Sequence, residues 1–163
     1  MTTVERPFDR VRQKMVTARI ELMAQLARFS ASELTQSVAE NEWSPLQIAH
    51  HLYIVDGLAL EQMKRVQDED NPLIIPLEEE GPRQTNHAEL PASLDVVLAG
   101  MAARREDTFT YLADLPDQAW ERPCQHKTWG QMKFYQLVNV LPKHDQGHAA
   151  QLSKLKARIE HDA

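Results

Sequence analysis

Cysteine is almost absent from this chain of 163 residues, and long apolar runs are absent altogether. The single cysteine, Cys124, cannot form an internal disulfide, which agrees with a reducing compartment. Hydrophobic residues make up 42% of the chain but never run for the roughly eighteen positions of a membrane span, and residues 1–10 lack the apolar segment of a secretory signal. We therefore predict a cytoplasmic protein that does not enter the membrane.

Basic residues are fewer than acidic ones, 18 against 24. The net charge of −6 argues against nucleic acid as a partner, because phosphate binding depends on clustered Lys and Arg. The chain has only five glycines and little of the β-branched alternation of strands, which favours helices. Its length fits one domain, residues 1–163, with a core that needs neither a disulfide nor a metal ion to hold it together.

Four amphipathic segments have helical spacing, over residues 8–29, 44–66, 91–112 and 130–159. We read residues 30–42 as a polar connection with a short turn at 32–34, residues 71–90 as a proline-containing loop, and residues 115–130 as a second irregular stretch. Long amphipathic helices with substantial connections predict an all-α four-helix bundle, antiparallel-like and with room for a crossover connection.

The second helix has a clear start and two adjacent histidines in its first two turns. Ser44 can cap the helix, Pro45 suits its first position, and Gln47 completes a capping box. Successive helical residues point about 100° apart, so His50 and His51 cannot both face one site. Periodicity favours His51, which lies at the edge of the core-facing stripe, but does not decide between the two, of which one must be a bystander.

The last helix has two histidines where its inner stripe calls for apolar side chains. His144 and His148 lie four residues apart, so both imidazoles can reach one ion. The pair alone is equally compatible with two histidines that bond to backbone carbonyls or water. A third ligand, which His51 can supply, favours the metal site and leaves coordination positions open for water or substrate.

At these residues the sequence resembles the DinB family, the DinB/YfiT-like metal-dependent hydrolases. The matching motifs are a W-S to H-L segment, a late H-x-x-x-H-x-x-Q-L and a TWGQM stretch, at residues 43–52, 144–152 and 128–132. The resemblance covers nearly the whole chain. It implies a four-helix bundle of DinB/YfiT-like type with a divalent-metal site at His51, His144 and His148.

The resemblance implies a metal-binding scaffold and leaves the reaction open. Metal-assisted hydrolysis of a small-molecule substrate and transfer of a low-molecular-weight thiol both fit, and no catalytic residue is assigned. Zinc and nickel are the favoured ions, although imidazole ligands also permit iron, copper or cobalt. The alternative is a non-enzymatic bundle with a structural metal or a bound small molecule. Base rates favour a homodimer.

Several other residues have expected roles. HDQGH, with Asp145 after the first histidine, is superficially similar to the HExxH helix of zinc proteases, but no further ligand motif follows, and a protease is not favoured. Asp145 is expected to be a surface charge or a hydrogen-bond partner of a ligand histidine, a role for which Gln47 and Gln151 also qualify. Further expectations are a kink or a break of the last helix at Pro142, an ordinary unreactive loop cysteine at Cys124 near His126, and core or pocket positions for Trp120, Trp129 and Tyr135.

Overall fold

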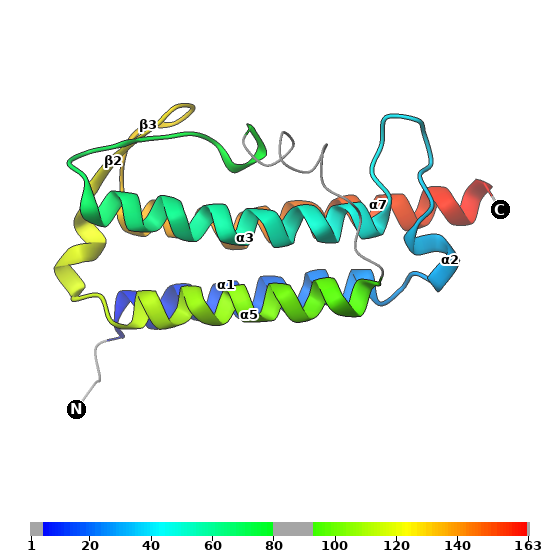
Figure 1. Ribbon diagram of the computed structural model, residues 1–163, viewed down its shortest axis with the longest axis horizontal. Helices are drawn as coiled ribbons and strands as arrows, with labels where there is room; N and C mark the ends of the chain where they lie inside the picture. Colours follow the sequence, from blue (N-terminus) through cyan, green and yellow to red (C-terminus); the bar gives the residue numbers. More distant parts are fainter. Residues whose placement is uncertain (1–4, 80–92, 163) are drawn as a thin grey trace.

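The computed structural model describes residues 5–79 and 93–162, and four long helices dominate it (Figure 1). They are α1 (Pro7–Leu26), α3 (Pro45–Asp68), α5 (Leu94–Ala113) and α7 (Val140–Asp162). The shorter elements are α2 (Ala31–Leu34), β1 (Leu73–Ile74), the 3-10 helix η1 (Asp117–Glu121), β2 (Pro123–His126), β3 (Gly130–Lys133) and α6 (Phe134–Val138). The predicted four-helix bundle is confirmed, and α2 lies where a short turn was expected. In the described ranges no helix is both long and apolar enough to cross a membrane.

The helix directions require a crossover. Figure 1 shows α1 and α7 running one way along the bundle and α3 and α5 running the other way. Because α3 and α5 are consecutive and parallel, the chain between them must return along the length of α3, which is about 36 Å for its 24 residues. This returning segment, residues 69–93, is called the crossover below.

The sequence predicted a loop over residues 71–90, but the described first part of the crossover contains regular secondary structure. It contains β1, and residues 77–79 are helical. The remainder of the predicted loop, with Gly81, Pro82 and Leu90, and the predicted helix start after Pro91 lie outside the described residues.

A small three-stranded sheet closes one end of the bundle, where the sequence had predicted an irregular stretch. β1 pairs in parallel with β2, and β2 pairs antiparallel with β3. The predicted start of the last helix near Gly130 is wrong, because Gly130 begins β3, at a φ of 77° that glycine adopts readily. The predicted break is present: the helix starts at Phe134 and is interrupted at Asn139, three residues before Pro142, which has no N–H to offer the preceding turn.

The core consists of two hydrophobic clusters, one towards the sheet and one towards α2. The apolar stripe predicted on each long helix contributes residues to both clusters. The first includes Met15, Val55, Met63, Leu112, Trp120, Phe134 and Leu141, and the second includes Leu22, Leu26, Ile48, Leu52, Met101, Leu152 and Ile159.

A layer of four charged residues lies where the two clusters meet. Each long helix supplies one of them: Arg19, Asp56, Arg105 and Asp145, hereafter the charge layer. Arg19 binds each aspartate through two hydrogen bonds of 3.0–3.1 Å, and Nη2 of Arg105 reaches Asp56 at 3.1 Å and Asp145 at 3.4 Å. Two positive and two negative charges balance inside the bundle, which a buried ion pair needs if it is to be tolerated.

Candidate metal centre

Three histidines and one carboxylate converge between α3, α7 and the crossover. His51 comes from α3, His144 and His148 come from α7, and Glu78 comes from the helical residues after β1. One ligand atom of each lies within 4.8 Å of the others. The structure thus brings together the three histidines predicted from the sequence. It adds Glu78, which the sequence did not predict.

Local structure determines how His51 is presented. Ser44 and Gln47 form the predicted capping box, with the Gln47 N–H donating to Ser44 Oγ at 3.2 Å and the Ser44 N–H donating to Gln47 Oε1 at 2.9 Å. A defined helix start sets the rotation of α3 and therefore which histidine faces inward. His51 is fully buried, whereas His50 stacks on Tyr53 away from the cluster. The prediction that His50 is the bystander agrees with these positions.

The ring nitrogens of the cluster face one another across a short gap. Nε2 of His144 and Nε2 of His148 are 3.3 Å apart, and Oε1 of Glu78 contacts both, at 3.0 Å in the case of His148. Nε2 of His51 lies 3.5 Å from Oε2 of Glu78. Two neutral imidazole lone pairs would repel at such a distance, so the arrangement calls for a proton or a cation between the nitrogens.

His51 provides an independent test of whether the cluster fits a metal ion. Within the part of the chain that the structure describes, neither of its ring nitrogens makes a hydrogen bond, although the side chain is fully buried. An unpaired buried nitrogen costs on the order of 1–3 kcal/mol, and coordination through Nε2 would remove part of this penalty. Three imidazole nitrogens and one carboxylate oxygen are a donor set that zinc, nickel and similar divalent ions accept.

The carboxylate of Glu78 and the imidazoles of His51 and His148 shift each other's pKa values. Hydrogen bonds from His144 and His148, together with the nearby His51 ring at 3.5 Å, hold the pKa of Glu78 far below its usual range. Burial lowers the pKa of His148, but hydrogen bonds with Glu78 and Gln151 outweigh burial, and the net shift is upward. Burial dominates at His51 and lowers its pKa. Glu78 is therefore a carboxylate at neutral pH, and His148 holds a proton more strongly than His51 does.

Of the three candidates for a second hydrogen-bond partner, only Gln151 takes that role. Its Oε1 lies 2.7 Å from Nδ1 of His148, which leaves Nε2 of that ring directed at the cluster. Gln47 is used by the capping box. The expectation that Asp145 is a surface charge is wrong: its side chain is 2% exposed and belongs to the charge layer. Because its carboxylate is bonded to Arg19 and Arg105, Asp145 cannot act as the general base of a zinc protease.

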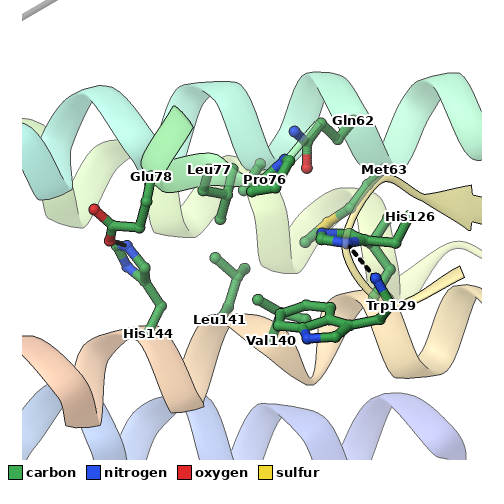
Figure 2. Close-up of a pocket in the computed structure, with 12 residues that line it drawn as sticks. Gln62, Met63, Pro76, Leu77, Glu78, His126, Trp129, Val140, Leu141 and His144 are labelled. Carbon is green, nitrogen blue, oxygen red and sulfur yellow. Dashed lines mark hydrogen bonds and ion pairs between the residues drawn. The ribbon is translucent and has the colours of Figure 1, made fainter. Parts of the chain in front are cut away.

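A cavity of about 160 Å³ opens from the cluster along α3 and α7 (Figure 2). Glu78 and His144 lie at one end of it, and His126 and Trp129 lie at the other. Leu141 and other apolar side chains form the walls between. Of the aromatic residues named from the sequence, Trp129 lines this cavity, and Trp120 is buried in the core against Phe134. Tyr135 packs at the edge of the first hydrophobic cluster.

Cys124 and His126 lie on β2 and not in a loop. Cys124 is fully buried and burial raises the pKa of its thiol, so the expectation that it is unreactive agrees with its environment. His126 was set aside together with it, yet its ring lines the cavity and stacks on Trp129 at 4.2 Å between ring centroids. Buried and exposed residues alternate along β2, which puts both side chains inward, but no sequence signal indicates a strand this short.

Comparison with known proteins identifies the class to which this fold and this cluster belong. The family model of the DinB superfamily matches residues 14–152, so the chain belongs to the DinB superfamily.

Among individual proteins, the chain is 26% identical over 161 residues to the uncharacterized protein YuaE of Bacillus subtilis, covering 88% of this chain and 95% of YuaE. It is 24% identical over 117 residues to a Bacillus cereus protein named "Putative metal-dependent hydrolase BCE33L2441", with 72% of this chain and 66% of that protein covered.

Two solved structures share the fold. YfiT of Bacillus subtilis, described as a probable metal-dependent hydrolase with an unusual four-helix bundle topology, superposes with a TM-score of 0.77 at 18% identity, covering 98% of this chain and 92% of YfiT. The four-helix bundle protein TT2238 superposes with a TM-score of 0.60 at 19% identity, covering 92% of this chain and 98% of TT2238. At these identities the likeness concerns the fold alone.

Proposed function

We propose that the protein is a metal-dependent hydrolase of a small-molecule substrate, with His51, His144 and His148 as ligands of a divalent ion, zinc or nickel. The observation that carries this proposal is the convergence of three imidazole nitrogens and the Glu78 carboxylate within 4.8 Å, around a buried histidine without hydrogen-bond partners in the described residues. The names of the Bacillus cereus relative and of YfiT, which mention metal-dependent hydrolysis, support it.

The residues of such a site have different roles. The three histidines hold the ion, and Gln151 keeps the His148 ring oriented. A divalent ion supplies Lewis-acid catalysis and lowers the pKa of a water molecule or thiol that reaches it. Glu78, whose side chain is 56% exposed, offers a carboxylate that accepts the proton of the attacking nucleophile. The apolar cavity beside Glu78 and His144 excludes bulk water from the substrate.

Transfer of a low-molecular-weight thiol is the second candidate function. The single cysteine is fully buried and lies outside the cluster, so any thiol that reacts at this site must come from solution. A thiol requirement would therefore appear as a dependence of turnover on an added thiol.

The test measures metal binding and turnover separately. Chelator-treated protein is titrated with Zn²⁺, Ni²⁺ and Co²⁺, and the visible spectrum of the cobalt form reports the ligand set. We expect one ion per chain in the wild type, loss of at least tenfold in affinity in His51→Ala, His144→Ala and His148→Ala, and full binding in the matched control His50→Ala.

Turnover is then assayed on a panel of esters, amides and thiol-reactive electrophiles, with and without an added thiol. Metal-dependent cleavage without a thiol supports the hydrolase, and strict thiol dependence supports the transferase. Stoichiometric metal binding with no turnover of any substrate, together with a large loss of melting temperature on chelation, would overturn both and leave a structural ion.

A further inference from the structure

The end of the cavity farthest from the cluster has its own polar groups, which the proposed chemistry does not use. His126 and Gln62 are both buried, with 5% and 6% exposure, and both line the cavity. Figure 2 shows them at the end opposite to Glu78 and His144. Each has one polar atom committed to the backbone and one that remains available.

The hydrogen bonds of His126 define which of its nitrogens carries the proton. Nδ1 accepts from the backbone N–H groups of Thr128 and Trp129, at 3.1 and 3.3 Å. A nitrogen that accepts cannot be protonated, so a neutral ring carries its hydrogen on Nε2. Burial lowers the pKa of His126, which keeps the ring neutral at pH 7. Nε2–H has no partner in the described residues and is a fixed donor.

Gln62 supplies the complementary acceptor. Its amide nitrogen donates to the backbone carbonyl of Ile75 at 2.8 Å. A carbonyl can only accept, so this bond fixes the orientation of the amide and leaves Oε1 as the free atom. No hydrogen bond to Oε1 occurs among the residues that the structure describes, and Figure 2 shows this oxygen directed from α3 towards the cavity.

Size and charge limit what this end can bind. A cavity of about 150 Å³ accommodates a benzene molecule, and this one measures about 160 Å³. Among the described lining residues, Glu78 is the only one with a formal charge at neutral pH when histidine is neutral, and it lies at the cluster end. An ionic group at the His126 end would be desolvated without a counter-charge, which is costly.

We propose that this cavity binds the non-reacting part of the substrate, a neutral group about the size of a benzene ring that carries a hydroxyl. The hydroxyl oxygen accepts from His126 Nε2–H, and the hydroxyl hydrogen is donated to Gln62 Oε1. His126 and Gln62 are then specificity-determining residues. The inference rests on the proposed function in one respect: the reacting end of the same molecule meets the metal site at Glu78 and His144.

The test compares two probes that differ only in the hydroxyl: benzyl alcohol and toluene. Their dissociation constants are measured by ligand-observed NMR on the full chain, both metal-free and zinc-loaded. We expect wild type to bind benzyl alcohol about 30-fold more tightly than toluene, the ratio expected for two net hydrogen bonds. In His126→Asn, where the amide oxygen still accepts from the turn but Nε2–H is gone, the ratio should fall to about fivefold, because only the bond to Gln62 Oε1 remains. His50→Asn is the matched control and should keep the wild-type ratio.

A second measurement keeps the proposal testable if His126→Asn does not fold. In wild type with ¹⁵N-labelled histidine, the His126 ring should show the Nε2–H tautomer, and the Nε2 signal should move with benzyl alcohol and not with toluene. Equal affinity of wild type for the two probes, an undiminished preference in His126→Asn, or no binding of either probe would overturn the proposal. Because metal binding is measured independently, hydroxyl preference without metal binding would refute the proposed function alone, and metal binding without hydroxyl preference would refute the cavity's role alone.

Discussion

At the scale of single residues, Glu78 is the group that links the three histidines. Its carboxylate contacts His144 and His148 and lies within 3.5 Å of His51, so it offers negative charge where a cation would be held. Its side chain is half exposed, unlike the largely buried histidines, and it comes from the crossover and not from a long helix. These properties suit a residue that adjusts the affinity of the site for a metal ion and transfers protons there.

We expect Glu78→Gln to weaken zinc binding about tenfold and to reduce metal-dependent turnover more strongly, because glutamine keeps the shape but neither attracts a cation nor accepts a proton. The dissociation constant is measured by competition with a chromogenic chelator. Glu79→Gln is the matched control, since the neighbouring carboxylate binds Lys127 at 2.5 Å and takes no part in the cluster. Equal effects of the two substitutions would contradict the assigned role.

The histidines could be anticipated from the sequence, and Glu78 could not, for a physical reason. His144 and His148 interrupt an apolar stripe of period 3.6, and the capping box at Ser44 sets the rotation that brings His51 inward. Glu78 lies in a segment whose path follows from the parallel directions of α3 and α5, which no local pattern encodes. His126 was missed for a similar reason, because a four-residue strand is too short to produce a clear period.

At the scale of elements, the crossover explains how a carboxylate from the middle of the chain reaches the last helix. A connection between parallel neighbours has to travel back along the bundle, and its described first part carries Glu78 to the histidines of α3 and α7. Pairing of β1 with β2, in the register of Leu73 with Gln125, anchors the segment shortly before Glu78. Substitutions that weaken this strand pair should therefore act on the site.

Another short element, α2, is tied to the last helix by an ion pair. Both carboxylate oxygens of Glu33 accept from Nζ of Lys156 at 3.0 Å. The backbone hydrogen bond from Ser30 and the bond from Lys156 lower the pKa of Glu33 from 4.5 to about 2. A depressed carboxyl pKa contributes stability above the unfolded value of 4.5, and this contribution is lost as the pH falls towards 2.

We expect Glu33→Gln to lower the melting temperature of the metal-free protein at pH 7 by a few degrees, because the pair is only partly buried. The difference from wild type should shrink between pH 4.5 and pH 2 as the wild-type carboxyl is protonated. Melting is followed by circular dichroism across this range. Glu40→Gln, an exposed residue of the same connection, should leave the melting temperature unchanged. A pH-independent difference for Glu33→Gln would contradict the linkage.

At the scale of the whole molecule, the charge layer separates two hydrophobic clusters in a bundle that could have been apolar throughout. The sequence contains the signal for it: each charged residue follows a core residue by four positions, as Arg105 follows Met101 and Asp145 follows Leu141. A charged residue at such a position is more often at the surface. The buried layer is therefore recognised only in the structure, where opposite charges from four helices pair. Such a layer favours one alignment of the helices along the bundle axis over slipped alternatives.

We expect Asp145→Asn to reduce the free energy of unfolding by about 3 kcal/mol, because removing one member of a buried charge network leaves an uncompensated arginine. The measurement is chemical denaturation of the metal-free protein, so that loss of metal binding does not contribute. Asp107→Asn, on the exposed face of α5, is the matched control and should change stability by less than about 0.5 kcal/mol. Replacing all four charges by apolar residues should restore most of the stability, and failure to do so would show that the layer contributes more than charge balance.

The order in which the ligands occur along the chain has a consequence for biosynthesis. His51 and Glu78 are translated long before His144 and His148, and α7 also carries Asp145, which completes the charge layer. A growing polypeptide on the ribosome thus has neither a complete metal site nor a neutral interior until α7 emerges. Metal capture should therefore follow synthesis of α7, and a translation product that stops before α7 should have two arginines for one aspartate in its charge layer, fail to fold and be degraded.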